Sequence, residues 1–225
     1  MIGCYNEKDT ILEAIKEAKE LKVDKEIIII DNNSTDGTKE ILNQIKDDSL
    51  QIILQPKNYG PGRSSKLAIS LAKGDYSFFP GADLEYKMSD VYRMITVMEE
   101  NNLDVVFGSR LLAKKHISKL QLIKERPQWL ATIVTTYLAN KWYNKKLTDI
   151  IGISLYRTNI LKNLKLKEDG HALTFELVSF ICKKGYKISE IPVYYKPRSK
   201  EEGKTIKWWD MISAIIAMIR VKLSG

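Results

Sequence analysis

The chain has 225 residues, of which 44% are hydrophobic and 28% are charged, a composition typical of a globular protein with one substantial core. Its formal net charge of +8 fits a nucleic-acid partner, an anionic membrane or phosphate-bearing small molecules, and it equally fits a plain lysine-rich surface. The sequence carries no helix-turn-helix spacing, zinc-finger cysteines or ribonucleoprotein aromatic motif, so we expect no nucleic-acid partner.

Strand-like and helix-like segments alternate along the first half of the chain. Apolar runs predict strands at residues 1–5, 25–30, 50–54, 76–79 and 104–107. Helical spacing predicts helices at residues 9–21, 60–73 and 89–101, and another over positions 41–45 that Ser34 is placed to cap. This alternation predicts an α/β fold with a mostly parallel central sheet and helices on both faces.

The second half contains longer apolar helices. They are expected at residues 127–143, 172–183 and 208–223, with strands at 150–157 and at 187–195, the latter broken at Pro192. A polar and basic loop occupies residues 196–207. We divide the chain into one domain over residues 1–206 and a C-terminal amphipathic helix over 207–225, placed either at a membrane interface or against the domain.

The two cysteines, Cys4 and Cys182, lie far apart and do not form the pattern of a disulfide framework, which fits a reducing compartment. No segment has the pattern of a signal peptide, and no run of about 18 uninterrupted apolar residues is present to span a membrane. We therefore expect a cytoplasmic protein, either free or in peripheral contact with the cytoplasmic face of the membrane.

Polar residues and glycines follow the end of each of the first five predicted strands. They are Asn6, Glu7, Asp31, Asn58, Gly60, Asp83, Glu85, Ser109 and Arg110. In an open parallel sheet, ligands bind beyond the carboxyl ends of the strands, so these side chains are expected to converge on one edge. Acids, glycines and an arginine gathered there are what a site for a phosphate and a metal requires.

Asp31 directly follows four isoleucines, where a carboxylate is placed to accept hydrogen bonds from a base or a ribose. We favour this ligand role over a capped turn, which accounts better for Ser34 and Asp36. The glycine-rich turn with Asn58 and Gly60 leads into a helix whose N-terminal amides fit a phosphate. Close packing of the backbone explains these glycines equally well.

Asp83 and Glu85 lie on a tight turn with one residue between them. Such a pair fits a divalent cation, Mg²⁺ or Mn²⁺, and the alternative is an acidic cap of the following helix. Arg110, just past a strand, is suited to a bidentate contact with phosphate or to a surface salt bridge. Asp149 is either a base or acceptor ligand or an ordinary turn acid, and Glu176 is either a buried functional acid or a partly exposed residue.

Seven motifs follow one another in an order that resembles family 2 glycosyltransferases with the GT-A fold, and among them the dolichyl- or polyprenyl-phosphate mannosyl- or glucosyltransferases. They are "CYNE", "EIIIIDNNSTDGT", "NYGPG", "AKGDYSFFPGADLEY", "DVVFGSR", "LTDIIGISLYR" and "GYKISEIPVYYKPRSKEEGKTIKWWD". The resemblance covers nearly the whole chain, from Cys4 to about Asp210. It implies a catalytic domain over residues 1–206 that moves a hexose, with inversion, from a GDP- or UDP-hexose to a polyprenyl phosphate or another cell-envelope glycan precursor.

The resemblance also implies roles for individual residues. Asp83 matches the second acid of the family's DxD metal motif, Arg110 its GSR or GTR arginine, and Asp149 an acid that faces the acceptor. We expect these three residues to be catalytic, and Asp83 and Glu85 to bind the metal. Substrate contacts are expected from Tyr5, Asn6, Glu7, Asp31, Asn58, Gly60 and Glu176, and from Arg198 and Lys204, which match basic positions of a loop that would close over phosphates.

The chain departs from the family pattern at the metal motif. Gly81-Ala82-Asp83 stands where Asp-Ala-Asp is usual, and Asn32 stands where a second Asp is common. Losing one carboxylate opposite a divalent cation either weakens metal binding or shifts it onto Asp83, Glu85 and the pyrophosphate itself, so we expect Mg²⁺ or Mn²⁺ to be bound weakly, with the help of the substrate, or not at all.

These observations leave a transferase, a binding protein and a nucleotidyltransferase to be distinguished. A transferase acting on a lipid phosphate needs no strong base, whereas one acting on a hydroxyl needs Asp149 or Glu176 to accept a proton. A non-catalytic nucleotide-sugar-binding protein with a degenerate DxD motif is the alternative. A nucleotidyltransferase would need a lysine and a glycine-rich loop at the first strand, where this chain has "CYNEKD".

Overall fold

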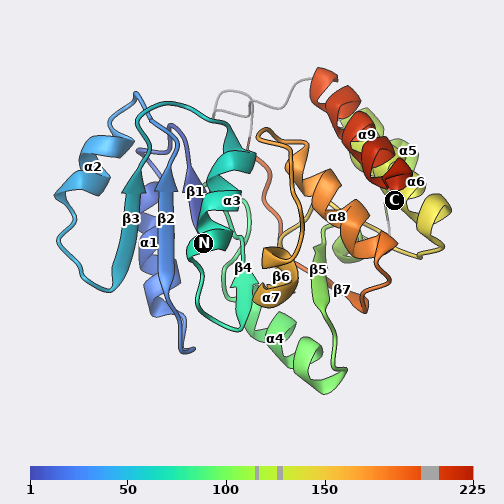
Figure 1. Ribbon diagram of the computed structural model, residues 1–225, viewed down its shortest axis with the longest axis horizontal. Helices are drawn as coiled ribbons and strands as arrows, with labels where there is room; N and C mark the ends of the chain where they lie inside the picture. The colour runs from blue at the N-terminus through green and yellow to red at the C-terminus, as the bar shows by residue number, and fades with distance from the viewer. Residues whose placement is uncertain (115–116, 126–128, 199–207, 225) are drawn as a thin grey trace.

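The computed structural model describes residues 1–114, 117–125, 129–198 and 208–224 (Figure 1). Its first half is a parallel three-stranded sheet in which β2 (Ile27–Asp31) lies between β1 (Ile2–Cys4) and β3 (Leu50–Leu54). The connecting helices are α1 (Ile11–Glu20) and α2 (Thr38–Gln44), and α3 (Pro61–Leu71) follows β3. The predicted alternation of strands and helices is confirmed here.

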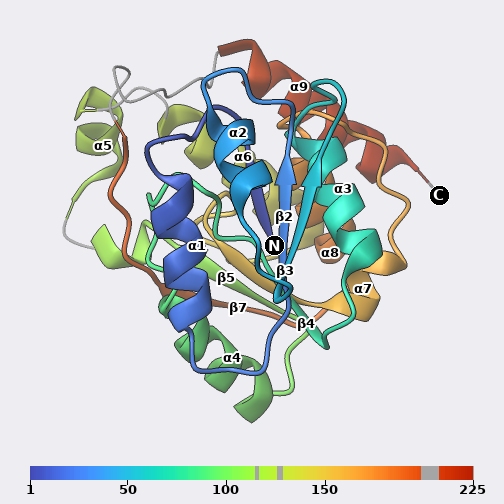
Figure 2. The ribbon, with the colours of Figure 1, turned by 90° about the vertical axis from the view of Figure 1, so that its left-hand side faces the viewer.

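The four isoleucines of β2 explain why helices cover both faces of this sheet. Ile27 and Ile29 pack in one core cluster with α1, whereas Ile28 and Ile30 pack with α3 in another. All five residues of β2 are buried, as expected of a parallel strand between two helical layers. Figure 2 shows α1 and α3 on opposite sides of β2 and β3.

The second sheet has the order β4-β6-β5-β7 and is mixed. Its strands are β4 (Tyr76–Phe78), β5 (Val105–Ser109), β6 (Ser154–Arg157) and β7 (Ile188–Pro192). β7 runs parallel to β5, but β6 runs antiparallel to both β4 and β5. The α-amino group of Met1 donates a hydrogen bond of 2.9 Å to the carbonyl of Phe78, which joins the first sheet to the second.

Helices cover both faces of the second sheet as well. α4 (Asp90–Glu100) packs against Val106 on one face. On the other face α6 (Trp129–Tyr143) and α8 (Leu173–Lys183) pack against Val105 and Phe107. Three short elements, η1 (Leu112–Lys114), α5 (Lys119–Glu125) and α7 (Thr158–Lys162), had not been predicted.

The C-terminal helix α9 (Trp208–Leu223) has the predicted bounds and lies beside α8, with Met218 in the same core cluster (Figure 1). Its outer face carries a row of exposed apolar side chains, which we call the α9 stripe: Ile212, Ile216, Ile219 and Leu223. No helix within the described ranges combines the length and the apolar sequence that a membrane crossing needs.

Two details of the predicted elements were wrong. Ser34 does not cap α2, because the helix begins at Thr38, whose backbone N–H donates to Asp36 Oδ1 over 3.0 Å. The segment 187–195 is not a pair of strands. β7 ends at Pro192, and within the described residues 193–198 Tyr195 forms an isolated bridge with Tyr86 in place of a second strand.

Candidate active site

Hydrogen bonds join the loops that follow β1 and β2. Asn6 Oδ1 accepts the backbone N–H of Thr35 at 2.8 Å, and the Asn6 N–H donates to Ser34 Oγ at 2.9 Å. The backbone N–H of Glu7 donates to Thr38 Oγ1 at 2.8 Å. The positions of Asn6 and Glu7 at this edge of the sheet are therefore fixed by the neighbouring strand's loop.

Asp31 lies at the predicted edge, but its carboxylate is fully buried. Its two oxygens accept the backbone N–H of Ser34 at 3.0 Å and the Ser34 hydroxyl at 2.5 Å. The side chain thus holds the turn after β2, and a contact with a nucleoside would require this turn to move. Tyr5, by contrast, is 44% exposed beside it.

Asn58 and Gly60 form a turn that is fixed by the protein itself. Asn58 Oδ1 accepts Asn32 Nδ2 and the Gly60 N–H, each at 2.9 Å. Gly60 has φ +90, and a Cβ there would lie 2.4 Å from the carbonyl oxygen of Asp169. That same oxygen accepts the Arg63 N–H at the start of α3. Close backbone packing therefore explains the glycines, and a protein carbonyl takes one of the helix N-terminal amides expected to meet a phosphate.

Three acids and one arginine from the segments after β1, β4 and β7 meet at this edge. We call them the Arg198 cluster: Glu7, Asp83, Glu85 and Arg198. The Arg198 guanidinium donates two hydrogen bonds, of 2.8 and 2.9 Å, to the Glu7 carboxylate. Arg198 Nη2 lies 3.7 Å from Asp83 Oδ2. The Arg198 backbone N–H donates to Glu85 Oε1 at 2.8 Å. Four predicted site residues are thus brought together.

The environment of Asp83 changes its acidity. Burial and the neighbouring Glu85 raise the pKa of Asp83 to about 6, against the opposing effects of the Glu85 N–H and of Arg198. A carboxyl group with a pKa near neutrality is a frequent feature of functional sites, although structural clusters also produce it.

Asp83 and Glu85 are the two carboxylates that were expected to bind a metal ion. Gly81 supplies no carboxylate, and a Cβ at this position, where φ is +80, would lie 3.1 Å from Asp83 Oδ1. In the part of the chain that the structure describes, no three His, Cys, Asp or Glu side chains are grouped to hold a metal ion. The group that lies among these acids is instead the Arg198 guanidinium, so the donor set does not fit a divalent cation in this conformation.

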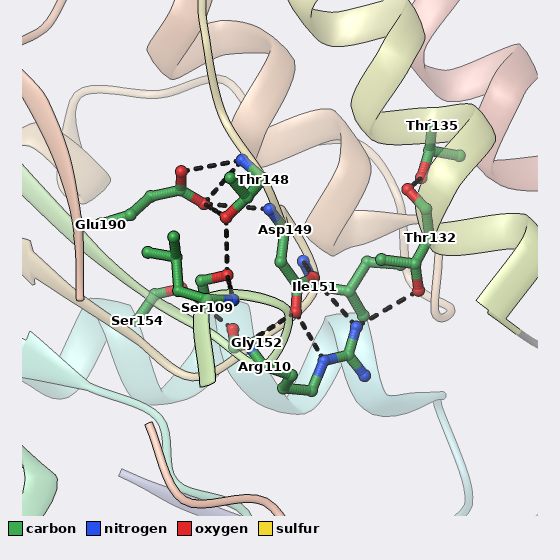
Figure 3. Close-up of polar contacts among 11 residues, drawn as sticks. Ser109, Arg110, Thr132, Thr135, Thr148, Asp149, Ile151, Gly152, Ser154 and Glu190 are labelled. Atoms are coloured by element: carbon green, nitrogen blue, oxygen red, sulfur yellow. Dashed lines mark hydrogen bonds and ion pairs between the residues drawn. The ribbon is translucent and has the colours of Figure 1, made fainter. Parts of the chain in front are cut away.

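A second group of polar side chains, which we call the Arg110–Asp149 network, lies at the end of β5 (Figure 3). Arg110 donates to the two carboxylate oxygens of Asp149 over 2.7 and 3.0 Å and to Thr132 Oγ1 over 3.2 Å. Asp149 is fully buried and also accepts the backbone N–H groups of Arg110 and Ile151. Arg110 was expected either to contact a phosphate or to form a surface salt bridge. In the structure it forms a salt bridge, and this salt bridge is buried.

Glu190 also belongs to this network and had not been predicted. Its carboxylate accepts the backbone N–H groups of Thr148 and Asp149 and the Thr148 hydroxyl, at 2.8 to 3.0 Å. Burial raises the pKa of Glu190, against these hydrogen bonds. Its only signal in the sequence is an acid among the apolar residues of "KISEIP".

A pair of tyrosines connects the Arg198 cluster to the Arg110–Asp149 network. The rings of Tyr86 and Tyr195 lie 5.0 Å apart, and the Arg110 guanidinium lies 5.1 Å from the Tyr195 ring and 4.8 Å from that of Trp129. Tyr86 directly follows Glu85 in the chain. The two groups of charged residues are therefore neighbours at one edge of the fold.

One predicted substrate contact among the described residues, Glu176, does not join this site. Glu176 is buried, and its oxygens accept the backbone N–H groups of Lys167 and Glu168 at 2.9 to 3.0 Å. It holds the 167–168 loop and is not the partly exposed residue of the alternative interpretation. Lys204 lies outside the described residues.

A cavity of about 320 Å³ adjoins the Arg110–Asp149 network. Its apolar lining comes from Leu111, Leu112, Ile117, Leu122, Ile133 and Leu147. Lys114 and Thr136 also line it, and the buried Thr136 hydroxyl has no hydrogen-bond partner among the described residues. An apolar cavity with a few polar groups is the usual form of a small-molecule site.

Known proteins are similar to this chain in sequence. The chain is 28% identical, over 97% of both sequences, to an uncharacterized protein of Methanocaldococcus jannaschii. It is 28% identical to the poly-beta-1,6-N-acetyl-D-glucosamine synthase of Staphylococcus aureus, over 78% of this chain but only 47% of that protein. This chain thus corresponds to about half the length of that synthase.

Among solved structures, the fold is similar to a glucosyl-3-phosphoglycerate synthase from Mycobacterium tuberculosis in complex with Mn²⁺, uridine diphosphate and glucosyl-3-phosphoglycerate. The TM-score is 0.70 at 15% identity, over 98% of this chain and 77% of that one, so the likeness concerns the fold. Residues 1–165 match the family described as Glycosyl transferase family 2, which is most of the chain. The chain therefore belongs to glycosyl transferase family 2.

Proposed function

We propose that this protein transfers a hexose from a GDP- or UDP-hexose, with inversion at the anomeric carbon, to a polyprenyl phosphate or a related cell-envelope glycan precursor. The observation that carries the proposal is the meeting of Glu7, Asp83, Glu85 and Arg198 at the carboxyl edge of the sheets, next to the Arg110–Asp149 network. Ligands of open α/β sheets bind at this edge, and membership of the family supplies the reaction type.

The state of the carboxylates favours a phosphate acceptor over a hydroxyl acceptor. Asp149 is paired with Arg110, and Glu176 accepts the backbone N–H groups of Lys167 and Glu168, so neither is placed to take a proton from a hydroxyl. A phosphate monoester has a second pKa of about 6 and is already a dianion near neutrality. Its oxygen attacks the anomeric carbon from the face opposite the nucleotide, while the bond to the diphosphate breaks and the diphosphate leaves with the bonding electrons.

The apolar cavity supports a lipid on the acceptor. Leu111 and Leu147 of its wall directly adjoin Arg110 and Thr148, so a hydrocarbon chain in the cavity would begin close to the Arg110–Asp149 network. The α9 stripe offers an apolar surface for the cytoplasmic face of a membrane in which such a lipid resides. This assigns α9 to peripheral membrane contact as well as to packing on α8.

The test begins with the donor. Thermal unfolding is measured with GDP-mannose, GDP-glucose, UDP-glucose and UDP-N-acetylglucosamine, and at least one of them is expected to raise the melting temperature because ligands that bind only the folded state stabilise it. The stabilising sugar nucleotide is then incubated with a short polyprenyl phosphate, and the glycosylated lipid is sought by mass spectrometry.

The outcomes separate the alternatives. Glycosylated lipid together with free nucleoside diphosphate supports the proposal. Binding of a sugar nucleotide with neither transfer nor hydrolysis would instead indicate the non-catalytic binding protein. Transfer to a saccharide hydroxyl but not to the lipid phosphate would overturn the acceptor assignment and leave the transferase activity in place.

A further inference from the structure

Arg198 is attached to the candidate site at two points. Its guanidinium forms a bidentate pair with Glu7, at 2.8 and 2.9 Å, and Nη2 lies 3.7 Å from Asp83. Its backbone N–H donates to Glu85, and the Lys196 N–H donates to the Glu85 carbonyl, both at 2.8 Å. The guanidinium therefore lies between the Glu7 and Asp83 carboxylates, and Glu85 holds the backbone that carries it.

The charges around this guanidinium explain its position. Glu7 and Asp83 place two carboxylates against the guanidinium and Gly81 adds none, so the positive charge of Arg198 offsets part of this negative charge. An arginine stays protonated throughout the physiological pH range. Its planar fork matches phosphate oxygens in the same bidentate way in which it matches the Glu7 carboxylate.

We propose that Arg198 provides the positive charge that neutralises the diphosphate of the sugar nucleotide, in the place where a divalent cation would otherwise be needed. The inference rests on the proposed function, because it assumes a nucleoside-diphosphate donor. When the donor binds, its diphosphate takes over Arg198 N–H groups that now bond Glu7. When the glycosidic bond breaks, the additional negative charge on the leaving diphosphate is stabilised by the same guanidinium.

This assignment makes two opposite predictions for the two partners of the ion pair. Replacing Arg198 removes the cation and weakens diphosphate binding. Replacing Glu7 by Gln removes the carboxylate that competes with the diphosphate for Arg198, and so strengthens binding. A gain of affinity cannot arise from misfolding, so the second variant keeps the test decisive even where the first is unstable.

The experiment measures the affinity for UDP and GDP by isothermal titration calorimetry, in EDTA and again in excess Mn²⁺. The wild-type protein is expected to bind one nucleotide in EDTA with a dissociation constant close to that in Mn²⁺. Arg198→Gln should weaken binding in EDTA by between about 10- and 100-fold, the loss expected for hydrogen bonds to a charged group. The affinity of Arg198→Lys should lie between those of the wild type and Arg198→Gln, because lysine keeps the positive charge but loses the bidentate guanidinium fork.

Arg220→Gln is the matched control. This change removes the same charge on α9, where Arg220 pairs with Glu168, and it should leave the affinity for UDP and GDP unchanged. Binding that requires Mn²⁺ in the wild type and is unaffected by Arg198→Gln would overturn the inference while the proposed donor stands. Failure of both nucleotides to bind under any condition would reject the donor, and the inference with it.

Discussion

Gly60 shows how a single residue positions a loop at the edge of the sheet. Its φ of +90 and the carbonyl oxygen of Asp169, 2.4 Å from a built Cβ, leave no room for a side chain. We expect Gly60→Ala to lower the free energy of unfolding by about 1–3 kcal/mol, because both the backbone conformation and the contact become strained. Gly3→Ala is the control, since nothing lies within 4 Å of a Cβ there, and it should change stability little in the same urea titration.

The buried ion pair of Arg110 and Asp149 is the second residue-scale feature. Asp149→Asn leaves the guanidinium without its counter-charge in a buried setting, so we expect a loss of about 3–5 kcal/mol in the free energy of unfolding. Asp169→Asn breaks the surface ion pair with Lys66. This variant should lose less than about 1 kcal/mol in the free energy of unfolding. Equal losses for the two variants would contradict the structural role given to Asp149.

The sequence predicts which residues reach the candidate site better than it predicts their partners. Asp83, Glu7 and Arg110 could be placed at the edge because each follows an apolar strand. Their partners come from distant segments: Arg198 is 191 residues from Glu7, and Asp149 is 39 residues from Arg110. Local patterns contain no information on such contacts, so the burial of Asp31 and the contribution of Glu190 could not be predicted either.

At the scale of single elements, α9 combines a packed face with an exposed one. The α9 stripe recurs at intervals of four, three and four residues, which places it on one side of the helix, opposite the buried Ala217 and Met218. We expect the protein to bind vesicles that contain anionic lipid, since its net charge is +8. Ile216→Glu with Ile219→Glu should weaken this binding by roughly tenfold, because two carboxylates then face the acyl region.

Sedimentation with phosphatidylglycerol vesicles measures this binding. Leu12→Glu serves as the control, because Leu12 is an equally exposed apolar residue on α1, and that variant should sediment like the wild type. If the wild-type protein stays in the supernatant, or if the α9 double variant sediments unchanged, the membrane role of α9 is wrong.

The elements themselves differ in how well the sequence predicts them. Regular apolar spacing gave α9 its bounds, and the isoleucine run gave β2 its buried position. The direction of β6 could not be predicted, because side-chain alternation is the same in a parallel and an antiparallel strand. α5 and α7 have seven and five residues, too few for a clear helical period.

At the scale of the whole molecule, the two sheets share side chains across their junction. Phe78 packs against the clusters of both α1 and α4, and Met1 packs against those of both α3 and α8. Each half contains one buried thiol, Cys4 in the first and Cys182 in the second, and burial raises the pKa of both, that of Cys182 to about 11. The reactivity of each thiol therefore reports on the unfolding of the half that contains it.

We expect both thiols to be unreactive towards a disulfide reagent at pH 8, because a buried thiol with a raised pKa forms little thiolate. Both should become reactive at the same urea concentration, since the shared core couples the halves into one transition. Mass spectrometry of the labelled protein assigns each modification. Labelling of Cys4 well before Cys182 would show that the first sheet opens independently.

The left-handed conformation at Gly81 limits how this sequence can change. Giving the turn a second carboxylate by Gly81→Asp would place a branched residue at φ +80, with its Cβ 3.1 Å from Asp83 Oδ1, at a cost of about 1–3 kcal/mol. It would also add an anion beside a guanidinium that already lies against Glu7 and Asp83. Gly81→Asp is therefore strained on its own, and a two-aspartate motif fits this turn only when the turn and Arg198 are exchanged together.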